Sequence, residues 1–169
     1  LDVLVNAQGV VPVGGLLEAT DQDWEEAFLL NAKSVFWAMQ AALPKMAAQG
    51  GGSVINIASV AAFKTVPGRF IYSATKAALV AMTKAAALEF APKGVRVNAI
   101  SAGPVRTLSA SAVGDFVKIL DHVEQASPLR RNIEPADVGA TAAFLCTPAA
   151  RGITGDILYV DSGMHAMGV

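Results

Sequence analysis

The sequence contains little of what marks a secreted, membrane-spanning or nucleic-acid-binding protein. Cys146 is the one cysteine among 169 residues, so no intrachain disulfide can form, and the apolar run AAFLC predicts that it lies in the core. The formal net charge of −1 gives no electrostatic attraction for nucleic acid or an anionic membrane. No apolar run approaches the roughly 18 residues of a membrane span. We therefore predict a cytoplasmic protein whose partners are small molecules or further copies of itself.

What the sequence does contain is apolar material in alternating short and long segments. Hydrophobic residues make up 53% of the chain, enough for the core of one domain. The predicted strands are residues 2–6, 53–58, 95–100 and 157–160, and the predicted helices are residues 24–49, 70–90, 113–126 and 135–146. The strands are apolar on both faces, which is typical of a parallel sheet covered by helices on both sides. We predict a doubly wound α/β sheet of Rossmann type, forming a single domain over residues 1–169.

Polar and small residues follow three of the predicted strands. Asn6 and Gly9 come after the first, Ser59 after the second, and the segment SAGPVRT, residues 101–107, after the third. Ligands of open parallel sheets bind beyond the carboxyl ends of the strands. The sequence therefore predicts a binding site at this edge.

The stretch FIYSATKAALVAMTKAAALEF, residues 70–90, adds a tyrosine and a lysine to this edge. Tyr72 and Lys76 are four residues apart, so on a helix they lie one above the other on the same face. That placement suits acid–base chemistry, although a single pair of this kind also arises by chance. Further elements are needed to interpret it.

Those elements are present in order along the chain. Ser59 stands thirteen residues before Tyr72, and Asn31 stands twenty-eight residues before Ser59, with NAQG from Asn6 and NAISAGPVRT from residue 98. Together they resemble the short-chain dehydrogenase/reductase family over essentially the whole chain. The resemblance implies a catalytic set, which consists of Asn31, Ser59, Tyr72 and Lys76.

The chemistry of carbonyl reduction explains these residue types. Hydride transfer leaves negative charge on oxygen, which needs a proton from a nearby acid, and Tyr72 is the predicted acid. A cation close to a phenol lowers its pKa by roughly 1 to 3 units, and we expect Lys76 to do so. Ser59 is expected to orient the substrate oxygen, and Asn31 to hold a water that links Lys76 to solvent. Taken singly, Ser59 also suits a turn or helix cap, and Asn31 also suits a solvent-facing position.

The resemblance implies NAD or NADP as the cofactor, and it implies no metal. The expected cofactor-binding residues are Asn6, Ala7, Gly9, Tyr72, Lys76, Gly103, Pro104, Val105 and Thr107. Lys76 is expected to hold the nicotinamide ribose hydroxyls, and Thr107 to donate to the carboxamide. Gly9 and Gly103 also suit ordinary positive-φ turns, and Thr107 also suits a helix N-cap.

The sequence departs from the usual family pattern at two places. The usual Asn-Asn-Ala-Gly is NAQG from Asn6, and the usual Pro-Gly after the third strand is Ala102-Gly103. The segments SAGPVRTLSAS and GITGDILYVDSG resemble bacterial enoyl-acyl-carrier-protein reductases, a branch in which six residues separate tyrosine from lysine. Arg69, not tyrosine, stands seven positions before Lys76. The Tyr72–Lys76 pair thus favours carbonyl or alcohol chemistry on 3-oxoacyl thioesters, with enoyl reduction as the alternative.

The family's Gly-x-x-x-Gly-x-Gly motif is not in this sequence. We therefore expect the chain to represent the C-terminal two thirds of the family fold, and the isolated chain to bind either nicotinamide weakly and to aggregate. A third alternative is a non-catalytic oligomerising fragment. The resemblance implies a homodimer or homotetramer through the alanine-rich face of residues 70–90, whose alternative role is intrachain packing. That face consists of Ala74, Ala77, Ala78, Ala81 and Ala85.

Overall fold

The computed structural model describes residues 1–64, 67–107 and 116–168, and within them four parallel strands form one sheet. The strands are β1 (Val3–Asn6), β2 (Gly52–Ile57), β3 (Val95–Ala102) and β4 (Ile157–Val160), and they lie side by side in that order. The predicted strands agree with them to within two residues at every end. The parallel sheet expected from the two-sided apolar pattern is confirmed.

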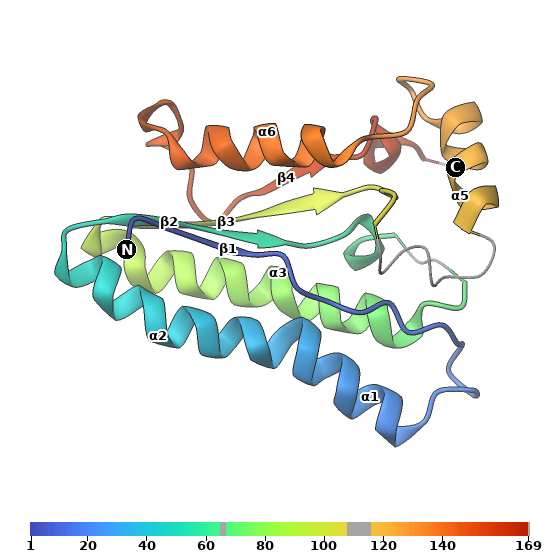
Figure 1. The fold of residues 1–169 in the computed structure, drawn as a ribbon, viewed down its shortest axis with the longest axis horizontal. Coiled ribbons are helices and arrows are strands. Elements are labelled where there is room, and N and C mark those ends of the chain that lie inside the picture. Colours follow the sequence, from blue (N-terminus) through green and yellow to red (C-terminus); the bar gives the residue numbers. More distant parts are fainter. Residues whose placement is uncertain (65–66, 108–115, 169) are drawn as a thin grey trace.

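Helices cover both faces of the sheet. Their bounds are α1 (Asp21–Phe28), α2 (Ser34–Ala48), α3 (Phe70–Phe90), α5 (Phe116–Ala126) and α6 (Pro135–Cys146), with short 3₁₀ turns at Val60–Ala62, Ala91–Lys93, Pro148–Ala150 and Met164–Ala166. Figure 1 shows the sheet between α6 on one side and α2 with α3 on the other. The doubly wound α/β class predicted from the sequence is therefore confirmed.

Alternate strand residues supply the cores of the two faces. Val54 points towards α2 and α3, into a cluster that includes Leu79 and Val97, whereas Ile55 joins Leu145 of α6. Burial on both faces explains why the central strands β2 and β3 read as continuous apolar runs, whereas Val3 and Val5 of the edge strand β1 are 38% and 47% exposed. Cys146 differs from the prediction that it lies in the core, because it is only partly buried and packs against the Leu145 cluster.

The first long helical segment is not one regular helix. It begins with a capping box, in which Asp23 N donates to Thr20 Oγ1 at 3.1 Å and Thr20 N donates to Asp23 Oδ2 at 3.1 Å. A π-helical turn over Leu29–Lys33 then separates α1 from α2. A π-turn is a local change in hydrogen bonding that an apolar period does not reveal, and such turns are frequent at functional sites. This one contains Asn31.

Two further observations complete the fold. The predicted helix at 113–126 is found as α5 from Phe116 onward, and residues 113–115 lie outside the described residues. Within the described part of the chain, no helix combines the length and the apolar character that crossing a membrane requires.

Candidate active site

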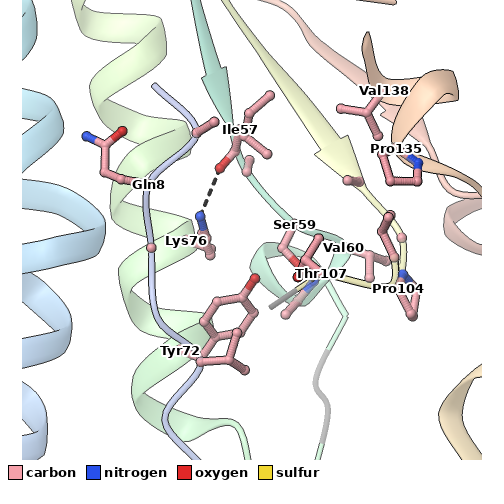
Figure 2. Close-up of a pocket in the computed structure, with 18 of the residues that line it drawn as sticks. Gln8, Ile57, Ser59, Val60, Tyr72, Lys76, Pro104, Thr107, Pro135 and Val138 are labelled. Carbon is pink, nitrogen blue, oxygen red and sulfur yellow. Dashed lines mark hydrogen bonds between the residues drawn. The ribbon is translucent and has the colours of Figure 1, made fainter. Parts of the chain in front are cut away.

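A cavity of about 540 Å³ opens at the carboxyl ends of β1, β2 and β3. Its walls are the three loops that follow these strands, together with residues of α3, α5 and α6. Figure 2 shows Ser59, Tyr72, Lys76 and Thr107 facing one common space, with Pro135 and Val138 of α6 across from them. The parallel register explains the convergence, because the carboxyl ends of all these strands meet at one edge.

Tyr72 and Ser59 form the centre of the cavity wall. Tyr72 lies in the first turn of α3, and Ser59 follows β2. Burial raises the pKa of the Tyr72 phenol, while its hydrogen bond with Ser59 and the positive charge of Arg69 act in the opposite direction. The phenol is therefore protonated at neutral pH. Ser59 Oγ also accepts from Ala61 N at 3.2 Å, so Ser59 caps the following 3₁₀ turn as well as facing the cavity.

Lys76 is buried beside Tyr72 and is directed at the backbone. Its side chain is 5% exposed, and Nζ donates to the Ile57 carbonyl at 2.8 Å (Figure 2). Nζ lies 5.8 Å from the centroid of the Tyr72 ring. Burial lowers the pKa of Lys76 to about 8. The prediction that Lys76 lowers the pKa of Tyr72 is wrong for this structure, because the opposing effects come from Ser59 and Arg69 and are outweighed by burial.

Asn31 is fully buried and connects three parts of the chain. Its Oδ1 accepts from Val10 N at 2.8 Å, and its Nδ2 donates to Val10 O at 2.9 Å and to Thr75 Oγ1 at 3.0 Å. The alternative of a solvent-facing Asn31 is therefore excluded. Asn31 fixes the loop after β1 against α3, one residue before Lys76. The water expected between Asn31 and Lys76 stays a prediction.

At Gly9 and at Gly103 the backbone lies so close to a neighbouring segment that a side chain would clash with it. A Cβ on Gly9 would lie 2.9 Å from Asn31 Oδ1 and 3.6 Å from Lys76 Nζ. A Cβ on Gly103 would lie 3.0 Å from the Asp161 Cα. Neither glycine has a positive φ, so the alternative of a positive-φ turn is wrong for both. The missing side chains let the backbone of both loops come close to the catalytic residues and to the end of β4.

The other expected cofactor residues divide into two groups. Ala7, Pro104, Val105 and Thr107 line the cavity. Asn6 is instead buried beneath it, where its Nδ2 donates to Asn56 Oδ1 at 2.8 Å. Asn56 Nδ2 in turn donates to Thr83 Oγ1 at 2.9 Å. The Asn6 side chain thus ties β1 to β2, and Asn56 ties β2 to α3; the cofactor contact expected of Asn6 stays a prediction.

Two residues with polar side chains line the cavity although the sequence pattern does not mark them as site residues. Gln8 lines the cavity, and its Nε2 donates to Ser34 Oγ at 2.9 Å, which ties the loop after β1 to α2. Arg69 also lines the cavity. Arg69 directly precedes α3, and its place three residues before Tyr72 in the sequence is the signal that could identify it.

Comparison with known proteins assigns the family. A family model described as "Enoyl-(Acyl carrier protein) reductase" matches residues 1–165, and a solved structure described as a "short chain dehydrogenase/reductase family protein" superposes with a TM-score of 0.89 at 37% identity, covering 99% of this chain and 68% of that one. The chain belongs to the short-chain dehydrogenase/reductase family. The resemblance stated from the sequence is thereby confirmed.

The relatives within this family carry two different names. An enoyl-[acyl-carrier-protein] reductase [NADH] FabI of a Nostoc species is 46% identical over 70% of this chain and 46% of its own length. A 3-oxoacyl-[acyl-carrier-protein] reductase FabG of Staphylococcus epidermidis is 36% identical over 98% of this chain and 67% of its own length. The solved enoyl-acyl carrier protein reductase of Bacillus cereus, with NADP+ bound, has a TM-score of 0.93 at 34% identity, covering 100% of this chain and 66% of that one. The chain thus spans between about half and two thirds of these relatives.

Proposed function

We propose that this protein is an NAD(P)-dependent oxidoreductase that reduces the 3-oxo group of acyl thioesters, or oxidises the corresponding alcohol. The observation that carries the proposal is the convergence of Tyr72, Ser59 and Lys76 on one cavity, with a phenol that is protonated at neutral pH. A protonated phenol is the acid that carbonyl reduction needs.

Each residue has a defined task in this proposal. Tyr72 Oη donates its proton to the substrate oxygen, and the Ser59 hydroxyl donates a second hydrogen bond that orients this oxygen. The rest of the wall is largely apolar, with Val60, Val105 and Val138 among its residues, so a bound acyl chain displaces water from the reacting oxygen. Asn31 maintains the geometry by holding Val10 and Thr75 in place.

The residues around the cavity fit a nicotinamide cofactor. The Gly9 backbone reaches close to Lys76, in a position that any larger side chain would obstruct. Lys76 is placed to donate to ribose hydroxyls, and Thr107 to the carboxamide. When bound, the nicotinamide supplies or accepts the hydride. The proposal includes NAD and NADP alike.

Enoyl reduction is the second candidate, and a specific finding favours it. The matched family model bears the description of an enoyl reductase, and FabI proteins stand beside FabG proteins among the relatives. Against it stands Arg69 at the position where that branch places its tyrosine, seven residues before Lys76. We therefore rank carbonyl reduction first.

Matched substrates distinguish the two candidates. The full-length protein is offered a 3-oxoacyl thioester and a 2-enoyl thioester of equal chain length, each with NADH and with NADPH, and cofactor oxidation is followed at 340 nm. We expect the 3-oxoacyl compound to be consumed at least about tenfold faster, which is a difference of about 1.4 kcal/mol in barrier. Consumption of the enoyl compound alone would overturn the proposal, and no turnover with either would favour a non-catalytic protein.

We also propose that the protein associates with itself through α2 and α3. The alanine-rich face of α3 is open to solvent at Ala77, Ala81 and Ala85, and Phe36 and Trp37 of α2 are 47% and 49% exposed. Large exposed aromatic side chains near a smooth alanine face favour close helix packing. Sedimentation should give a dimer or tetramer at micromolar concentration, and Trp37→Glu should shift it towards the monomer.

A further inference from the structure

The charges around the cavity are of one sign. Among the described residues that line it, the charged side chains are Arg69 and Lys76, and both are cationic. Lys76 Nζ already donates to the Ile57 carbonyl. Arg69 Nη1 donates to Gly68 O at 2.8 Å, a bond that occupies one of the five N–H donors of a guanidinium. A half-buried guanidinium in an otherwise apolar wall is suited to an oxygen acceptor on a ligand.

The backbone holds Arg69 in a fixed position beside the acid. Gly14 N donates to Gly68 O at 3.0 Å, and Phe70 N donates to Gly14 O at 3.3 Å, so Arg69 pairs with Gly14 in a short parallel bridge. Arg69 directly precedes α3, Tyr72 follows three residues later in the first turn of that helix, and both residues line the same cavity. The influence of the Arg69 charge on the phenol agrees with this proximity.

We propose that Arg69 binds a second oxygen of the substrate, on carbon 1, while Tyr72 and Ser59 hold the reacting oxygen on carbon 3. The inference rests on the proposed carbonyl reduction and assigns the residue that recognises the second oxygen of its 3-oxo substrates. The carbon-1 oxygen belongs either to a thioester or to a free carboxylate. A guanidinium binds both, and it binds a carboxylate through two parallel hydrogen bonds.

Three substrates and three variants test this assignment. The substrates are a 3-oxoacyl thioester, the free 3-oxo acid, and the methyl ketone that lacks carbon 1 and is otherwise identical. In the full-length protein, Arg69→Gln should lower kcat/KM for the first two by about 10- to 100-fold, the range of a lost charge-assisted hydrogen bond, and should leave the ketone within about twofold. Arg69→Lys should retain part of the activity. Arg151→Gln, which removes an exposed charge in the turn before β4, should change none of the three.

The pattern of losses decides the outcome. An equal loss for all three substrates would mean that Arg69 acts through Tyr72, and no loss for any would mean that it has no role; either result overturns the proposal. A larger loss for the free acid than for the thioester identifies the carboxylate as the natural group, and the reverse identifies the thioester.

A binding measurement separates this inference from the proposed function. Titration calorimetry of the 3-oxo acid, with oxidised cofactor present so that no reduction occurs, should give a Kd that rises by about 10- to 100-fold in Arg69→Gln. If the wild type turns over none of the substrates but shows this difference in Kd, the proposed reaction fails and the role of Arg69 stands. Equal Kd values, or no binding by the wild type, overturn the role of Arg69.

Discussion

The two faces of the sheet hold their polar side chains in different ways. On the face covered by α2 and α3, polar side chains bond to one another, as in the series Asn6, Asn56 and Thr83. On the face covered by α6, polar side chains of the strands donate to backbone carbonyls, as Ser53 does to Leu145 O at 3.0 Å and Asn98 to Ile153 O at 3.0 Å. The first arrangement fixes helices against strands through specific partners, and the second attaches a segment of chain to the sheet.

This difference explains where the chemistry lies. Asn56 precedes Ile57, whose carbonyl accepts from Lys76, and Thr83 lies two turns after Lys76 on α3. The Asn56–Thr83 hydrogen bond therefore sets the position of the Ile57 carbonyl relative to the lysine. On the opposite side, α6 contributes Pro135, Val138 and Ala142 to the cavity wall. We infer that the α3 face positions reacting groups and that the α6 face shapes the space for the substrate.

The largest expected effect comes from removing the acid on the α3 face. Tyr72→Phe deletes the phenolic hydroxyl and leaves the ring packed, so turnover of the full-length protein should fall by roughly 10² to 10⁴, about 3 to 5 kcal/mol of barrier. Circular dichroism and thermal unfolding should be unchanged within error. Near-normal turnover would remove Tyr72 as the acid.

Removing a buried side chain on the α6 face should lower the free energy of unfolding and leave turnover nearly unchanged. Leu145 is fully buried among Ile55, Ile100 and Ala150, so Leu145→Ala should lower the free energy of unfolding by about 3 kcal/mol. Turnover per folded molecule should change by less than about threefold, because Leu145 packs in the cluster on the α6 face, whereas Tyr72 and Lys76 belong to α3 on the other face. Urea denaturation measures the first quantity. Leu88→Ala, at a position 82% exposed, is the matched control and should be close to neutral. A large loss of turnover in Leu145→Ala would contradict the division between the faces.

The pH dependence of the free energy of unfolding should show that burying Lys76 on the α3 face destabilises the protein. The pKa of Lys76 falls from 10.5 in the unfolded chain to about 8 in the folded one, so the unfolded state binds the proton more tightly. The resulting destabilisation of the folded state is complete below pH 8. This unfavourable term is lost as the pH rises from about 8 towards 10.5. Lys76→Met should therefore be more stable than the wild type at pH 7, and the gap should narrow by about 2 kcal/mol at pH 9.5. Denaturation of both proteins at the two pH values gives this difference. A gap that does not change with pH would mean that Lys76 is not buried as a cation.

The elements of the fold follow from the sequence because their patterns are local. The apolar period, the glycine runs and the Thr20–Asp23 box each depend on residues close together in the chain. The pairing of Asn6 with Asn56, fifty residues away, depends on which strands become neighbours and on side-chain rotamers. For the same reason the sequence does not reveal the buried hydrogen bond of Asn6, and the cofactor contact that it suggests for this residue stays a prediction.

For the candidate active site too, the sequence predicts which residues come together but not how their side chains are directed. The Tyr72–Lys76 spacing correctly brings both residues to one wall of the cavity, but it does not predict the direction of the lysine. Burial and the acceptor at Ile57 determine that direction, and burial also determines the raised pKa of the phenol. Arg69 could be found from its place three residues before Tyr72, although closeness in the sequence does not distinguish a cavity residue from a surface one.

The smallest expected effect tests the shaping role of α6. Val138 is partly buried, lines the cavity and packs against the Leu145 cluster. Val138→Ala removes two methylene equivalents from the wall, which makes room for a longer acyl chain without touching Tyr72, Ser59 or Lys76. One methylene in an apolar pocket is worth about 1 kcal/mol, so the ratio of kcat/KM for a long over a short 3-oxoacyl thioester should rise by roughly 3- to 10-fold. Val117→Ala, at a position of α5 that is 61% exposed, is the control and should leave the ratio unchanged. An equal fall in kcat for both chain lengths would mean that α6 positions the reacting groups and does not shape the substrate cavity. That result would contradict the proposed difference between the two faces.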